Sequence, residues 1–177
     1  MRSRTLQELV DEAAIAHADA ALALSDLVGE SRLEIEGGGS VVRFAATPEA
    51  VTFDLQFVGS VSEEAGTWMW GWNNVNGFPE HIIELAKHIH DVGGEEGIAE
   101  LTTALVPVER TSPEQLLAAS KAIAGRYWSA DMEAAPGVLV HMILDGPPLD
   151  VPTVERATQA VTDALTSGLV SDHIAAL

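Results

Sequence analysis

The sequence contains no cysteine, which excludes disulfides, cysteine-based zinc sites and cysteine nucleophiles. It also has little positive charge: nine lysines and arginines stand against 27 aspartates and glutamates, for a net charge of −18. Such a surface repels a phosphate backbone, so we expect no binding to nucleic acid. No run of about 18 apolar residues occurs, so we expect no membrane span.

The N-terminal segment lacks a further feature, the uninterrupted apolar stretch of a signal peptide, because acidic residues break up the sequence after Arg4. We therefore expect a soluble, cytoplasmic protein. A length of 177 residues, 47% of them hydrophobic, suits one domain with a substantial core, and we predict a single domain over residues 1–177. The sequence indicates no particular cofactor and leaves a homo-oligomer open.

Hydrophobic periodicity predicts a long helix over residues 5–28, followed by an antiparallel β-meander over 32–74. Residues 79–168 are predicted to be mainly helical, with a fully buried strand at 137–144. Strands that precede helices favour an α+β fold. In that fold the meander packs against the N-terminal helix and the later helices.

The best-marked of the later helices lies in TSPEQLLAASKAIAG. Ser112 is placed as its N-cap, Pro113 as its first residue and Gln115 as the capping-box partner, while Gly125 marks its end. These local signals fix both ends of the helix without reference to the rest of the chain.

The stretch GTWMWGWNN, residues 66–74, carries tryptophans at every second position. A four-residue hairpin loop at 62–65 would place these rings on the face of Phe53, Leu55 and Phe57, whereas a slip of one residue would put them on the polar face. Gly59, opposite Trp68, would leave room for a ring. The register favours a core role for the three residues Trp68, Trp70 and Trp72. The alternative is a pocket for an apolar or sugar-like ligand.

This G-T-W-x-W-x-W-x-N pattern resembles the signature of an uncharacterised bacterial domain family of unknown function. In that family the tryptophan strand is followed by a helix, and later by a helix, a glycine and a strand with a tyrosine. KAIAGRYWSADM is similar to this second feature, with Gly125, Tyr127 and Trp128. The resemblance covers about residues 5–145 and implies a related fold and no catalytic role. The helix predicted after residue 150 lies outside it.

His81, Glu84 and His88 form the sharpest ionisable cluster, at i, i+3 and i+7 on one face of a predicted helix. Imidazole and carboxylate groups at this spacing could share a metal ion, which makes a metal-dependent hydrolase one hypothesis. The alternative is an ordinary solvated helix face.

Three other ionisable residues have two interpretations each. His141 lies in an apolar strand and is interpreted as a hydrogen-bonded core histidine, with a perturbed catalytic base as the alternative. Asp131 and Glu133 are interpreted as ordinary loop charges, with an acid–base pair beside an aromatic wall as the alternative. His17 carries no signal.

The absence of a catalytic constellation favours a non-catalytic module that binds a small apolar or amphipathic ligand. We place that ligand at the aromatic and amide residues Trp68, Trp70, Trp72, Asn73 and Trp128. Charge supplies another hypothesis: between Arg43 and Arg110, eleven acidic residues face one basic residue, Lys87. An interaction or immunity-type protein that neutralises a basic partner would have such a surface, and so would a merely soluble one.

Overall fold

The computed structural model describes residues 3–37, 39–45 and 50–171 of the chain. The elements, in chain order, are α1 (Leu6–Val28), β1 (Leu33–Glu36), β2 (Val41–Phe44), β3 (Val51–Ser62), β4 (Thr67–Trp70), the 3₁₀ turn η1 (Gly71–Asn73), α2 (Glu80–Glu96), α3 (Ala99–Thr102), β5 (Leu105–Pro107), α4 (Pro113–Ala124), β6 (Ser129–Ala135), β7 (Val138–Asp145) and α5 (Val154–Thr166).

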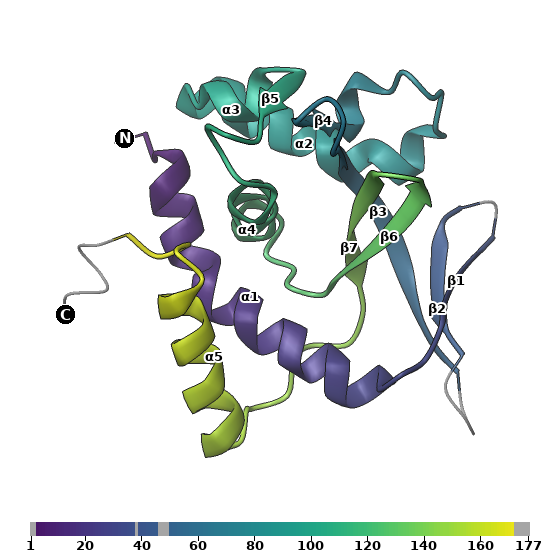
Figure 1. Cartoon of the computed structure of the whole chain (residues 1–177), viewed down its shortest axis with the longest axis vertical. Helices are drawn as coiled ribbons and strands as arrows, with labels where there is room; N and C mark the ends of the chain where they lie inside the picture. Colours follow the sequence, from purple (N-terminus) through teal and green to yellow (C-terminus); the bar gives the residue numbers. More distant parts are fainter. Residues whose placement is uncertain (1–2, 38, 46–49, 172–177) are drawn as a thin grey trace.

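The strands form one curled antiparallel sheet, with β1 to β5 in sequential order (Figure 1). The long strand β3 is its centre, because β2 and then β4 pair along one edge while β7 pairs along the other. Strand β6 adds to the outer edge of β7. The predicted α+β fold, with its meander and its N-terminal helix, is confirmed.

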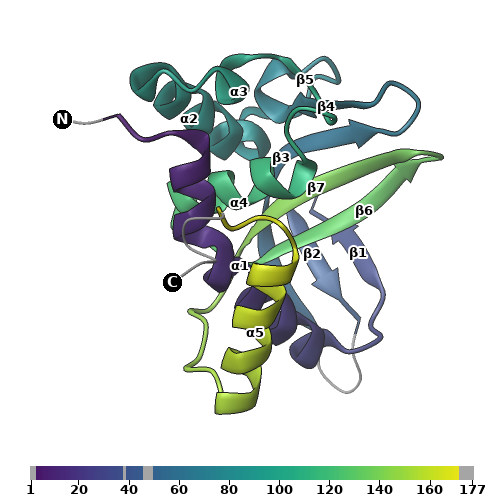
Figure 2. The same cartoon turned by 60° about the vertical axis from the view of Figure 1, so that its left-hand side comes forward.

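Two helices begin at capping boxes. In each, the side chain of the N-cap residue accepts from the backbone N–H three residues later, and the side chain of that later residue accepts from the backbone N–H of the N-cap. Thr5 and Glu8 cap α1, and Ser112 and Gln115 cap α4, as predicted for the latter. Helix α4 ends at Gly125, whose φ of 62° is a backbone conformation that suits glycine. It lies between α1 and the sheet, while α5 packs on another side of α1 (Figures 1 and 2).

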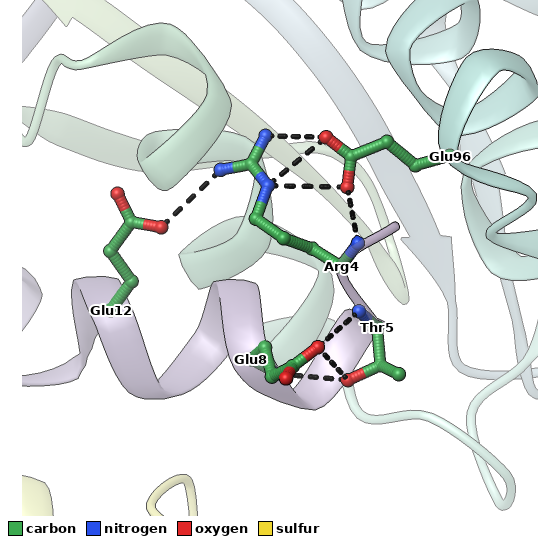
Figure 3. Close-up of polar contacts among 5 residues, drawn as sticks. All are labelled: Arg4, Thr5, Glu8, Glu12 and Glu96. Atoms are coloured by element: carbon green, nitrogen blue, oxygen red, sulfur yellow. Dashed lines mark hydrogen bonds and ion pairs between the residues drawn. The ribbon is translucent and has the colours of Figure 1, made fainter. Parts of the chain in front are cut away.

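An ionic clamp joins the beginning of α1 to the end of α2 (Figure 3). The Arg4 guanidinium donates to the Glu96 carboxylate through Nε at 3.0 Å and Nη2 at 2.6 Å, and its backbone N–H donates to the same group at 3.1 Å. Arg4 also reaches Glu12 at 3.3 Å. The hydrogen bond from Arg4 lowers the pKa of Glu96 below its usual value. This clamp fixes two segments that are far apart in sequence.

The hairpin loop has four residues, 63–66, but the pairing differs by two from the prediction: Val61 faces Trp68 and Gly59 faces Trp70. The prediction that Gly59 leaves room for the Trp68 ring is nevertheless confirmed, because a Cβ at residue 59 would lie 2.5 Å from Trp68 Cζ2. A shift of two residues keeps the same parity, so it moves no side chain to the other face.

The prediction that the tryptophans share a face with Phe53, Leu55 and Phe57 is wrong. Strand β3 has a bulge against β7: Phe57 pairs with Met142, but Gly59 pairs with His141. Adjacent partners point to opposite faces, so the alternation in β3 inverts across the bulge. Trp68 and Trp70 consequently join a cluster with α1, α3 and α4, while the three β3 residues named above pack in a second cluster with α2 and the end of α1.

Two boundaries also differ from the sequence prediction. Strand β4 ends at Trp70, because the chain turns through η1, so Trp72 and Asn73 lie outside the sheet. The segment 79–168 contains β5 and β6 besides β7, and β7 is buried only from His141 to Leu144, since Leu139 is exposed. The assignment of residues 1–177 to one domain stays a prediction.

Candidate functional site

Trp68 and Trp70 are closed off from solvent, with exposed fractions of 0% and 1%. Their ring centroids lie 5.2 Å apart in an edge-on arrangement. The Trp70 indole N–H donates to the Glu100 carbonyl at 2.9 Å, which satisfies the polar end of the ring. The structure therefore supports the core interpretation for these two rings.

Trp72 is only half-buried and packs against His90 of α2, with the two rings tilted by 59° and their centroids 4.5 Å apart. It lies in η1 with Asn73. The turn is stabilised by Asn74, whose φ of 34° is left-handed and whose side-chain oxygen accepts from the Phe78 N–H at 2.7 Å. These residues bring the chain from the sheet into α2.

Trp128, the fourth tryptophan, is only 8% exposed but lines two hollows in the surface. Its indole N–H donates to the Pro147 carbonyl at 2.7 Å, which holds the loop after β7 against the ring. Phe53 supports the other side, with centroids 5.7 Å apart. A side chain on Gly146 would collide with Phe53, so this loop approaches the core as closely as a glycine allows.

Two adjoining hollows share Trp128, Pro147 and Pro148 as a wall. The Tyr127 hollow has a volume of about 500 Å³, and its other lining residues are Ala16, Gly125, Arg126, Tyr127, Leu144, Asp145, Gly146 and Leu149. The Asp26 hollow has about 400 Å³, and its other lining residues are Ala23, Asp26, Leu27, Asp150 and Arg156. The first is mainly apolar, and the second combines an apolar wall with a charged rim.

His81, Glu84 and His88 line a different depression, the α2 groove, of about 550 Å³. Within the described ranges, no three or more histidine, aspartate or glutamate side chains are grouped so as to hold a metal. The metal site on these residues stays a prediction. The α2 groove and the Tyr127 hollow meet at an ion pair in which Arg126 Nη2 lies 3.0 Å from Asp145 Oδ2.

In the α2 groove, Gln56 of β3 inserts its amide into the backbone of α2. It donates to the His81 carbonyl at 2.8 Å and accepts from the Leu85 N–H at 3.0 Å. These are the two groups that an uninterrupted helix would join to each other. One strand side chain therefore ties the first turns of α2 to the sheet.

A second cluster of ionisable groups lies where α1, α4 and the β6–β7 hairpin meet, with Lys121 and His141 buried and Asp131 at the surface. Lys121 is fully buried, and its Nζ lies 2.8 Å from His17 Nδ1. Nearby, His141 Nδ1 lies 2.8 Å from Asp131 Oδ1, and the His141 ring packs 5.0 Å from that of Trp68. His141 is thus a hydrogen-bonded core histidine, as predicted, and Asp131 lies on β6 rather than in a loop.

Burial controls the charge of this cluster. It lowers the pKa of Lys121 to about 7, although the negative charge of Asp131 acts in the opposite direction. Burial also lowers the pKa of His17 to about 4, and the positive charge of Lys121 adds to that effect. At neutral pH, His17 is therefore an uncharged acceptor for Lys121. An amine of this kind can act as a base, but no hollow described above reaches it.

Sequence reasoning missed Lys121 and His17, although a signal was present. The stretch from Leu116 to Lys121 is continuously buried, and a helix that is apolar on all sides belongs inside a protein. Lys121 is the only basic residue of that helix. His17 stands in a similarly alanine-rich stretch of α1. A charged residue in such a helix points to a buried polar contact.

The fold and the hollows define an α+β protein with a closed tryptophan core and an aromatic-walled surface site. The sequence matches DUF6882, a family of unknown function, over residues 7–147, and the chain belongs to that family. Helix α5 lies beyond the match, as expected for the helix after residue 150. No curated protein and no solved structure matches the chain. None of the helices in the described ranges is both long and apolar enough to cross a membrane.

Proposed function

We propose that this protein is a non-catalytic binding module that takes a small apolar or amphipathic ligand against Trp128. The observation that carries the proposal is the pair of hollows that share this ring. Their volumes, about 500 and 400 Å³, lie in the usual range for small-molecule pockets. The hydrogen bond from Trp128 to Pro147 fixes the shared wall, so a ligand would meet a largely preformed surface.

Nile red, a neutral apolar dye that brightens on leaving water, tests the proposal. Pro148 is exposed and belongs to the wall of both hollows, so Pro148→Glu adds a charge to the site without opening the core. Pro136 is exposed on the β6–β7 turn and lines neither hollow, so Pro136→Glu is the matched control. We expect saturable dye binding by the native protein and the control, and binding about tenfold weaker by Pro148→Glu.

Equal dye binding by both variants would place the dye elsewhere and remove the support for this site. The absence of saturable binding to the native protein would refute the proposal itself. Quenching of tryptophan emission, measured in Trp72→Phe so that the half-buried Trp72 does not contribute, gives a second readout, because Trp128 lies at the site while Trp68 and Trp70 are enclosed.

The α2 groove supports a second proposal, docking of a basic protein partner. Asp54 and Glu84 line this groove, and none of the ion pairs among the described residues uses either carboxylate. A lysine-rich peptide should bind less tightly to an Asp54→Lys, Glu84→Lys variant than to a Glu133→Lys, Glu155→Lys variant of the same net charge. Equal affinity would show attraction by net charge alone and would contradict the docking site.

A further inference from the structure

Acidic side chains outnumber basic ones in the lining of the Asp26 hollow. Asp26 of α1 is exposed and lines the hollow, and no ion pair among the described residues involves it. Asp150 and Arg156 complete the charged part of the rim. Asp26 therefore presents an unpaired carboxylate beside the apolar wall formed by Trp128, Pro147 and Pro148.

The guanidinium of Arg156 is already engaged. Its Nε donates to Asp19 Oδ1 at 2.8 Å, and its Nη2 donates to the Asp150 carbonyl at 3.0 Å and to Asp150 Oδ1 at 3.1 Å. The side chains of Arg156 and Asp19 are 13% and 12% exposed, so this pair is largely shielded from solvent. An anionic ligand would have to compete with two carboxylates for the one guanidinium.

The adjoining Tyr127 hollow also lacks a spare cation. Arg126 is the only basic residue in its lining, and it is paired with Asp145. Across both hollows, each guanidinium already has a carboxylate, whereas the Asp26 carboxylate has no cation. The local charge balance thus has the same sign as that of the whole chain, −18.

We infer that the ligand of this site is a cationic amphiphile. Its ammonium group binds at Asp26, and its apolar part lies against Trp128, Pro147 and Pro148. This inference rests on the function proposed above and specifies the chemical class of the ligand. It depends on charge complementarity at an apolar wall: the wall accepts the body of the ligand, and the uncompensated carboxylate selects the head.

Three eight-carbon probes with different heads test the inference: octylammonium, 1-octanol and octanoate, each used to displace bound Nile red. We expect octylammonium to displace the dye at a concentration about fivefold lower than 1-octanol, which is the scale of one exposed ion pair, and octanoate to be the weakest. Asp26→Asn should bring octylammonium to the level of 1-octanol and leave 1-octanol unchanged. Glu109→Gln, the same charge change at an exposed residue that lines neither hollow, should keep the preference.

Three results would overturn the inference. They are equal displacement by octylammonium and 1-octanol, stronger displacement by octanoate, and a preference for octylammonium that survives in Asp26→Asn. In each case Nile red still binds, so the proposed function is retained while the inferred class of ligand is refuted. If Nile red does not bind to the native protein, the proposed function falls and the inference falls with it.

Discussion

The buried amine of Lys121 makes a strong prediction about stability and pH. Its pKa is about 7 in the folded protein, against an ordinary value of 10.5. Between about pH 7 and pH 10.5, the unfolded chain carries a proton on Lys121 that the folded chain has lost. The free energy of unfolding therefore rises with pH over this range, at about 1.36 kcal/mol per pH unit. Below pH 7 both states are protonated and the contribution is constant. The amine therefore costs the fold roughly 4 kcal/mol at neutral pH, relative to its deprotonated form.

Lys121→Met removes the titration and keeps most of the side-chain volume. It also leaves His17 without its partner, a cost of about 1–3 kcal/mol that does not depend on pH in this range, because the pKa of His17 is about 4. The pH slope, rather than the absolute stability, is thus the diagnostic quantity. The chain has no cysteine and a single tyrosine, so few other groups titrate between pH 7 and 10.

Urea unfolding of the native protein and of Lys121→Met, at intervals from pH 7 to 10, measures this slope. The stability of the native protein relative to the variant should increase by several kcal/mol over the range. Two parallel curves would refute the reasoning, because they would mean that Lys121 titrates alike in the folded and unfolded states.

Three further substitutions test packing and the N-terminal clamp. Gly59→Ala should cost about 1–3 kcal/mol in urea unfolding, since its Cβ would press on Trp68. Gly94→Ala, with nothing within 4 Å, should instead add up to about 0.5–1 kcal/mol in the last turn of α2. Equal effects would contradict the close approach at Gly59. Arg4→Ala should lower the free energy of unfolding by about 0.5–1 kcal/mol, because it removes the ion pair with Glu96, and by less in about 1 M salt. A loss of stability that is the same at low and high salt would argue against an ionic clamp.

Much of the fold was predictable because its signals are local. The capping box of Ser112 and Gln115 and the glycine at residue 125 fix α4 from a few adjacent residues. The alternating pattern of β3 likewise predicts a strand at the centre of a meander. The bulge at Phe57–Gly59 was not predictable in this way, because it appears only as a change of partner along β7. That non-local pairing decides which core receives Trp68 and Trp70.

The candidate site was predictable only in part, for a related reason. Trp128 stands out in the sequence as a large aromatic residue, and it does line the hollows. Its neighbours there come from α1, from the loop after β7 and from the start of α5, which only the tertiary fold brings together. The contact between His17 and Lys121 joins residues 104 positions apart, and no spacing rule links them.

The bulge in β3 also determines how the protein would respond to the loss of a single residue. Removal of Val58 would leave Phe57 and Gly59 adjacent, opposite Met142 and His141, so the residues on either side of the bulge would keep their partners and their faces. Gly59 would still lie against Trp68, and the loss would be the side chain of Val58, which is fully buried in the cluster of Trp68 and Trp70. A one-residue deletion at this point would therefore cost the contacts of one buried side chain and leave the arrangement of both clusters unchanged.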